Sequence, residues 1–150
     1  MGEPRGRPGG PAALAPRPHR ARSDRRARAG GRAVSGLWRA PDGVRIFYED
    51  QPGPAEALPV VCLPGLTRGA RDFTALAAHL AGARRVIRPE MRGRGRSGRA
   101  DPATYALPVE VGDILGLLAS LGVTRAVFVG TSRGGLQTMA LAAANPALVA

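Results

Sequence analysis

The feature that most constrains this chain is an apolar run that ends in a glycine–serine–glycine pattern. Residues 126–129 are apolar, and Gly130-Thr131-Ser132-Arg133-Gly134 follows them directly. Glycines at both ends of this pattern allow a strand and a helix to approach closely, because a Cβ at either position would clash across the turn. The sequence therefore predicts a tight strand-to-helix turn with Ser132 in a strained conformation, beside the helix N-terminus and the N–H of Arg133. A simpler alternative is that Ser132 only caps a glycine-rich helix.

The composition fits one globular domain with a basic N-terminal extension. The net charge is +11, but ten arginines against Glu3 and Asp24 place +8 of it in residues 1–40. The single cysteine, Cys62, excludes a disulfide within these 150 residues. Because it lies in an apolar run, we expect a core residue rather than a reactive thiol. No stretch approaches the ~18 consecutive apolar residues of a membrane span, and we expect a cytoplasmic protein without a membrane partner.

Residues 1–35 are rich in arginine, proline, glycine and alanine and lack apolar periodicity. Such a segment cannot bury enough apolar surface to offset its chain entropy, so we expect a disordered tail. It is interpreted as a passive extension or a misassigned start. Two alternatives are non-specific contact with a polyanion and a targeting role, although no apolar segment follows Arg25-Arg26 as an export signal would require. The tail has no interleaved aromatic residues, and we expect no specific nucleic-acid partner.

Residues 36–150 show the alternation of strands and helices that is typical of a parallel sheet covered on both faces. A β-hairpin comes first, with Asp42-Gly43 as its turn, and segments 59–63, 85–89 and 126–129 are the expected parallel strands. Three helices are predicted from apolar residues spaced by three and four: Phe73, Leu76, Ala77 and Leu80; Val111, Ile114, Leu115 and Leu118; Leu136, Met139, Ala140 and Ala143. Gly82 and Gly122 are expected to end the first two, and His79 is expected on the surface.

Three pieces of this region resemble, in the right order, the motifs of the α/β-hydrolase superfamily. Leu63-Pro64-Gly65-Leu66 resembles the loop after the family's third strand, where many members have His-Gly. Residues 88–97 resemble its Pro-Asp-x-Arg-Gly-x-Gly-x-Ser loop, with Glu90 in place of the usual aspartate. Residues 130–135 resemble the nucleophile elbow, the turn that carries the reactive serine. The resemblance extends from about residue 36 to residue 150 and implies a partial α/β-hydrolase fold that lacks the C-terminal strands.

By this resemblance Ser132 is the nucleophile of an esterase-like serine hydrolase. The backbone N–H groups of Leu66 and Arg133 are implied to form the oxyanion hole, and acyl transfer to water would pass through an acyl-serine. The resemblance implies a small-molecule substrate and neither a cofactor nor a metal. The side chain of Arg133 could instead reach an anionic substrate group or lie on the exposed side of the helix.

A rival pattern lies in Gly93-Arg94-Gly95-Arg96-Ser97-Gly98, which satisfies the dinucleotide-binding fingerprint Gly-x-Gly-x-x-Gly. That mechanism requires the third glycine to open a helix whose N-terminus holds the pyrophosphate. No helical pattern begins before Pro108, and Asp113 lies inside a helical pattern rather than at the end of a strand. We therefore do not expect a dinucleotide cofactor.

The catalytic partners of Ser132 are missing from these 150 residues. In the resembling family an acid and then a histidine follow the serine, yet no His, Asp or Glu follows Ser132, and the only histidines are His19 and His79. We expect a fragment of a longer hydrolase that is inactive by itself. The alternatives are a frameshifted remnant and a short protein with a non-catalytic role, namely an α/β binding module whose basic tail contacts polyanions.

Overall fold

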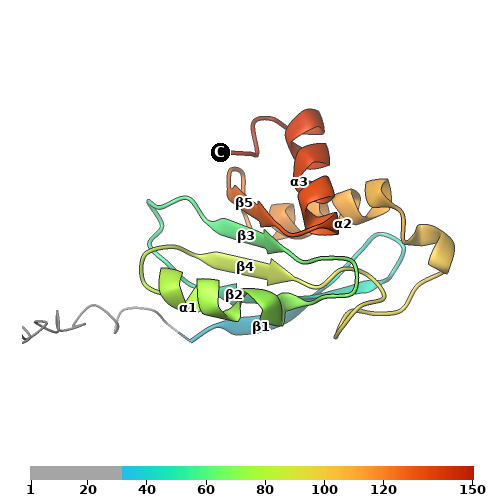
Figure 1. Ribbon diagram of the computed structural model, residues 1–150, viewed down its shortest axis with the longest axis horizontal. Helices are drawn as coiled ribbons and strands as arrows, with labels where there is room; N and C mark the ends of the chain where they lie inside the picture. Colours follow the sequence, from blue (N-terminus) through green and yellow to red (C-terminus); the bar gives the residue numbers. More distant parts are fainter. Residues whose placement is uncertain (1–31) are drawn as a thin grey trace, which may run out of the picture.

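The computed structural model describes residues 32–150, so the disorder predicted for most of the tail lies outside the described residues (Figure 1). Five strands form one sheet in the order β1-β2-β4-β3-β5. They are β1 (Val34–Arg39), β2 (Arg45–Gln51), β3 (Val60–Leu63), β4 (Val86–Pro89) and β5 (Val127–Gly130). β1, β2 and β4 pair antiparallel, whereas β3 pairs parallel with β4 and β5. β1 begins two residues before position 36, because Val34 and Ser35 already pair with β2.

The hairpin between β1 and β2 has a three-residue loop in place of the expected two-residue turn. The N–H of Ala40 donates to the carbonyl of Val44, and the N–H of Gly43 donates to the carbonyl of Ala40, both at 2.8 Å. Gly43 has φ +89°, in the left-handed region that glycine enters without steric cost. Asp42-Gly43 therefore predicted the hairpin, but with Pro41 included the loop is a type I turn followed by a bulge.

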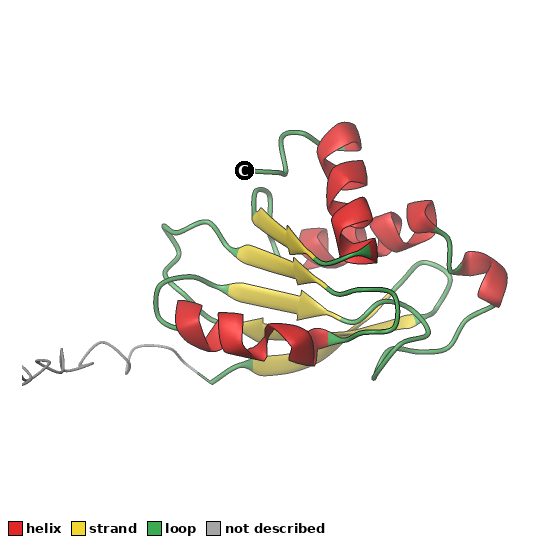
Figure 2. Ribbon diagram, viewed as in Figure 1, coloured by secondary structure: helices red, strands yellow, loops and turns green. Residues whose placement is uncertain are grey.

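Helices cover both faces of the sheet, as the sequence predicts (Figure 2). One face carries a 3₁₀ turn, η1 (Ala70–Phe73), which runs directly into α1 (Thr74–Leu80). The other face carries α2 (Leu107–Ser120) and α3 (Arg133–Ala144), with a short 3₁₀ turn, η2 (Pro102–Thr104), before α2. None of the helices among residues 32–150 is long and apolar enough to cross a bilayer.

Alternation along the buried strands divides the core between the two faces. Val60, Cys62 and Val86 pack with Phe73 and Ala77 under η1 and α1. The neighbouring residues of the same strands point the other way, because successive side chains of a strand face opposite sides. Val61, Leu63 and Ile87 therefore pack under α2 and α3. The same cluster includes Met91 from the loop after β4 and helix residues Ile114, Leu118 and Leu141.

The third helix presents its apolar stripe to solvent, which contradicts the burial implied by its spacing. Leu136 is 49% exposed and Met139 is 61% exposed. The buried side of α3 is formed instead by Gly134, Gln137 and Leu141. The helix axis must lie close to β3 at Gly134, and this close approach decides which side of α3 faces the sheet.

The outer edge of β5 is partly covered by the last residues of the chain. The N–H of Ala126 donates to the carbonyl of Leu148 at 2.8 Å, and the N–H of Ala150 donates back to Ala126 at 3.0 Å. Ala126 and Val149 thereby form an isolated parallel bridge. The edge is therefore capped at its beginning, although β5 has only β3 as a full partner among the described residues.

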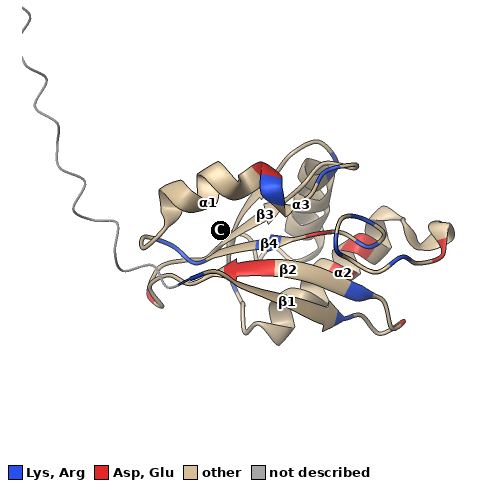
Figure 3. Cartoon of the chain, turned by 90° about the horizontal axis from the view of Figure 1, so that it is seen from below, with Lys and Arg blue, Asp and Glu red and all other residues tan. Residues whose placement is uncertain are grey.

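Acidic and basic residues are interspersed over the described part of the chain (Figure 3). β2 carries Glu49 and Asp50, and arginines from β4 and its flanking segments pair with them across the strands. Arg88 meets Glu49 at 2.6 Å, and Arg85 meets Asp50 at 2.7 Å. The folded region therefore neutralises much of its own charge by local pairing.

Candidate active site

Ser132 lies in the turn between β5 and α3 with a backbone conformation that serine rarely adopts. Its φ is +51° and its ψ is −114°, and it has the only positive φ of a non-glycine residue among residues 32–150. The residue is exposed, and α3 begins at the next position, Arg133. A strained residue of this kind persists only where the surrounding structure holds it, and strained residues cluster at functional sites.

The two glycines that flank Ser132 are required by backbone packing on both sides of the turn. A Cβ on Gly130 would run into the carbonyl group of Gly134. A Cβ on Gly134 would run into the carbonyl oxygen of Leu63 and lie 2.6 Å from its carbonyl carbon. The clash at Gly130 lies across the turn, as the glycine pattern predicts. The clash at Gly134 shows in addition that helix α3 starts in direct contact with strand β3.

The loop after β3 lies beside this turn. The N–H of Thr131 donates to the carbonyl of Leu63 at 3.1 Å, which continues the pairing of β3 with β5 to the end of both strands. The Cβ position of Gly65 is 3.7 Å from Cβ of Ser132. Leu66, the next residue, is half exposed. The structure thus brings the loop of Leu66 next to Ser132 and Arg133, the three residues that the sequence singles out.

The N–H groups of Leu66 and Arg133 both lack a backbone acceptor among residues 32–150. Arg133 is the first residue of α3, so its N–H has no acceptor within the helix. For the N–H of Leu66, residues 32–150 offer no backbone acceptor. Both N–H groups therefore remain available to the oxygen atom of a ligand bound at this turn.

The side chain of Arg133 takes neither of the two positions considered from the sequence. It turns inward, and its Nε donates to Oε2 of Glu110 at 2.7 Å while its Nη2 donates to the carbonyl oxygen of Tyr105 at 3.0 Å. Glu110 is completely buried in α2. The first residue of α3 is thus tied to α2 and to the segment before it.

Glu110 gathers three donors around its carboxylate. Besides Arg133, Arg94 donates to Oε1 at 2.6 Å and Gln137 donates to Oε2 at 2.8 Å. Burial by itself would raise the pKa of Glu110, but the hydrogen bonds from Arg94, Arg133 and Gln137 outweigh it and lower the pKa below its ordinary value. Glu110 is therefore a carboxylate at neutral pH, which links the loop after β4 to the start of α3.

Glu90 makes a similar link on the other side of the candidate site. Its carboxylate accepts the N–H of Ala70 at 3.3 Å and the N–H of Arg96 at 2.7 Å, and it also pairs with the Arg96 guanidinium. Burial would raise the pKa of Glu90, and the bonds from Arg96 and Ala70 outweigh it, so the pKa is lowered. Glu90 thus connects the loop after β3 with the loop after β4.

The glycine-rich loop at 93–98 lacks the geometry of a dinucleotide site. No helix opens at Gly98, whose N–H instead donates to the carbonyl of Arg45 at 2.7 Å. Asp113 is buried in α2 and forms two hydrogen bonds of 2.7 Å with Arg92. Within residues 32–150, no group of three His, Cys, Asp or Glu side chains is arranged to hold a metal ion.

Sequence reasoning missed the inward-facing acids of α2. Glu110, Asp113 and Leu117 are spaced by three and four residues, so they lie on one face of α2 together with Ile114. This face is buried, and the predicted stripe of Val111 and Leu115 flanks it half buried. The sequence did contain a signal for these buried acids. They are spaced to lie on an otherwise apolar helical face, and the loop before the helix is rich in arginines that could pair with them.

The family assignment agrees with this geometry. Residues 59–150 match the alpha/beta hydrolase fold family, and the chain belongs to this family. Among solved structures, an alpha/beta hydrolase from Novosphingobium aromaticivorans is similar with a TM-score of 0.76 and 51% identity, over 79% of this chain and 42% of that one. The predicted family and partial fold are thereby confirmed.

Curated relatives carry the names of hydrolases. A 3-hydroxybutyrate-oligomer hydrolase from Cupriavidus necator is 43% identical over 105 residues, which are 69% of this chain and 36% of that protein. A 2-hydroxymuconate semialdehyde hydrolase from a Pseudomonas species is 40% identical over 83 residues, 55% of this chain and 29% of that protein. The chain therefore spans about a third of the length of these curated relatives.

Proposed function

We propose that these residues form the nucleophile-bearing part of a serine hydrolase of the esterase type. The observation that carries the proposal is the exposed Ser132 at φ +51°, on a turn enclosed between β3, α3 and the loop after β3. A hydroxyl in this position is reached by a substrate from solvent and adjoins two N–H groups that lack backbone acceptors in the described part of the chain. The hydrolase names of the relatives support the same reaction class.

In the proposed reaction, Oγ of Ser132 attacks the carbonyl carbon of an ester and gives its proton to a histidine base. The backbone N–H groups of Leu66 and Arg133 stabilise the oxyanion, and removing one such donor costs about 3 kcal/mol in other hydrolases. The C–O bond of the ester then breaks, the departing alcohol takes the proton, and an acyl-serine remains. Water attacks that acyl group by the reverse proton path and restores Ser132.

The acid and the histidine of this mechanism are proposed to come from residues beyond position 150 in the whole protein. His79 does not suit the role, because it is exposed on α1 on the sheet face opposite α3. We accordingly propose that residues 1–150 alone are inactive and that the whole protein acts on a small-molecule ester in the cytoplasm. The relatives' names refer to small organic molecules and support a small-molecule substrate, and the ester is part of the proposal.

A fluorophosphonate probe tests the proposal in the protein made from the complete reading frame. We expect one labelled serine, Ser132, and loss of the label in Ser132→Ala. Ser120→Ala is the matched control, since Ser120 ends α2 and its hydroxyl donates to Leu117 at 2.7 Å. Labelling that persists in Ser132→Ala would refute the assignment. An unlabelled, folded protein that binds RNA would favour the alternative of a non-catalytic module.

A further inference from the structure

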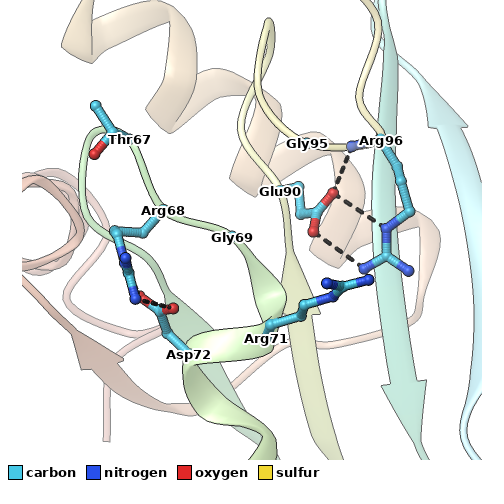
Figure 4. A pocket seen from close by; sticks show the side chains of 8 residues that line it. All are labelled: Thr67, Arg68, Gly69, Arg71, Asp72, Glu90, Gly95 and Arg96. Carbon is cyan, nitrogen blue, oxygen red and sulfur yellow. Dashed lines mark hydrogen bonds and ion pairs between the residues drawn. The ribbon is translucent and has the colours of Figure 1, made fainter.

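A cavity of 490 Å³ opens between the loop after β3 and the loop after β4. Figure 4 shows the residues that line it, and these are Thr67, Arg68, Gly69, Arg71, Asp72, Glu90, Gly95 and Arg96. Open α/β sheets bind their ligands outside the carboxyl ends of the strands, which is where this cavity lies. Its volume is within the range of small-molecule sites.

The charges of the cavity wall do not cancel. Three arginines face two carboxylates, which leaves one positive charge in excess. Asp72 is occupied by Arg68, with two hydrogen bonds of 2.7 and 2.8 Å. Glu90 is occupied by Arg96, and a side chain on Gly69 or Gly95 would run into its carboxylate. Both acids therefore have partners already.

Of the three arginines in the cavity wall, Arg71 is the one without an acidic partner among residues 32–150. Within residues 32–150 it forms no ion pair and no side-chain hydrogen bond, although arginine offers five N–H donors. Its side chain extends along the cavity toward Arg96 and Glu90 (Figure 4). The Arg71 guanidinium therefore keeps its donors for an anion from solvent, and a carboxylate matches its planar geometry.

The cavity adjoins the candidate nucleophile through Arg68. The Cβ position of Gly65 lies 3.4 Å from Cγ of Arg68 and 3.7 Å from Cβ of Ser132. One wall of the cavity is therefore continuous with the loop that carries Leu66. A substrate whose ester carbonyl lies at Ser132 would have to pass Gly65 and Arg68 to place a charged end in the cavity.

We propose that this cavity is an anion subsite in which Arg71 binds a carboxylate of the substrate, so that the enzyme prefers esters of small organic acids that carry a negative charge. The exposed Arg68 guanidinium is the second donor, since its pair with Asp72 leaves part of its N–H groups to the solvent. This inference rests on the proposed esterase function. It specifies that the substrate carries a negative charge and that Arg71 is the residue that binds it.

The test compares three esters in the protein made from the complete reading frame. Ethyl butyrate is neutral, monoethyl succinate carries a carboxylate on the acyl side, and O-butyryl glycolate carries one on the alcohol side. We expect Arg71→Gln to raise KM for at least one anionic ester about tenfold, with kcat and the neutral ester unchanged. Which anionic ester responds identifies the side of the substrate that enters the cavity.

Arg125→Gln is the matched control, because Arg125 is exposed at the opposite end of the sheet and its loss changes the net charge equally. The inference is wrong if Arg71→Gln leaves KM for both anionic esters unchanged, or if it raises KM for the neutral ester to the same extent. A second measurement does not depend on turnover. Binding of monoethyl succinate and O-butyryl glycolate to Ser132→Ala, followed by calorimetry, should weaken about tenfold for at least one of them when Arg71→Gln is added.

The two proposals fail in different ways. Absence of Ser132 labelling and of hydrolysis of every ester refutes the esterase function, whereas the calorimetric arm still reports on the cavity. Normal hydrolysis of ethyl butyrate without any effect of Arg71→Gln refutes the anion subsite alone.

Discussion

Replacing Gly134 by alanine tests the contact between β3 and α3 that shapes the candidate site. The new Cβ would run into the carbonyl oxygen of Leu63 and lie 2.6 Å from its carbonyl carbon, whereas ordinary van der Waals contact begins near 3.4 Å. The obstacle is backbone, and Leu63 pairs with β5 through Gly130, so it cannot move aside as a flexible side chain would. Strand and helix would have to separate by an ångström or more, because the carbonyl oxygen is closer still.

The neighbouring Gly135 provides a matched control in the same turn of α3. Its Cβ would meet only the carbonyl oxygen of Gly130, at an ordinary 3.7 Å. Alanine is favoured over glycine in a helix by about 0.5–1 kcal/mol, so Gly135→Ala should be neutral or slightly stabilising. Overpacking costs about 1–3 kcal/mol, and the upper end applies to Gly134→Ala because the strained contact is backbone on both sides.

Urea unfolding followed by circular dichroism measures both variants in the same background. We expect Gly134→Ala to lower the free energy of unfolding by about 3 kcal/mol relative to Gly135→Ala. Equal stability of the two variants would show that α3 does not start against β3 as described. It would also remove the reason for the strained backbone of Ser132.

Four further outcomes are expected from the structure. Ser132→Gly should raise the free energy of unfolding by about 1 kcal/mol, since glycine tolerates φ +51°, and Ser132→Ala should not; urea titration decides. Because the pKa of Glu110 is lowered in the folded protein, its contribution to stability is complete above the ordinary pKa of 4.5 and is lost as the pH falls below that value. Glu110→Gln should therefore have a lower free energy of unfolding at pH 7, and that free energy should fall less between pH 7 and pH 4 than in the unchanged protein. Burial raises the pKa of Cys62 to about 11, so iodoacetamide at pH 8 should modify it only after unfolding. Met139→Glu, at a position 61% exposed, should change the unfolding free energy by less than about 0.5 kcal/mol in urea titration.

Much of the fold could be predicted because its signals are local. The parallel strands, the hairpin and the three helices follow from apolar runs, from Asp42-Gly43 and from periodicity. The parallel strands lie within one residue of their expected ends, whereas α2 and α3 begin three to four residues before the first apolar residue of their predicted stripes. Cys62 is buried and His79 is exposed, as expected. These features depend on residues close in sequence, so a single chain is enough to recognise them.

The candidate site was harder to predict because its contacts join distant segments. The position of Ser132 on a tight turn could be expected from its flanking glycines, but the inward course of the Arg133 side chain could not. That course depends on Glu110, 23 residues earlier, whose acidic side chain breaks the apolar pattern of α2. The exposure of Leu136 and Met139 could not be predicted for a related reason. Helical spacing shows that these residues share one face of α3, but it does not show which part of the fold covers that face.

The loops at the carboxyl edge of the sheet are held mainly by charge rather than by apolar contacts. Glu110 joins Arg94 and Arg133, Asp113 holds Arg92 through two hydrogen bonds, and Glu90 joins Ala70 to Arg96. All 22 basic residues of the chain are arginine, and the planar guanidinium can meet a carboxylate with two parallel bonds. Removing one member of such a buried pair costs about 3–5 kcal/mol, since the remaining charge stays unpaired.

This arrangement makes the candidate site more sensitive to acid than the core of the sheet. Protonation of Glu90 and Glu110 removes the bonds that hold the loops after β3 and β4 and the start of α3, whereas the apolar clusters around Val61 and Val60 do not titrate. Both carboxyl groups have a lowered pKa, so the links persist through neutral pH and fail only below the ordinary range of glutamate. As the pH is lowered below 4.5, amide hydrogen exchange should therefore become faster in the segments around residues 66–71 and 94–97 before it does in β3 and β4. Uniform loosening of sheet and loops would contradict this order.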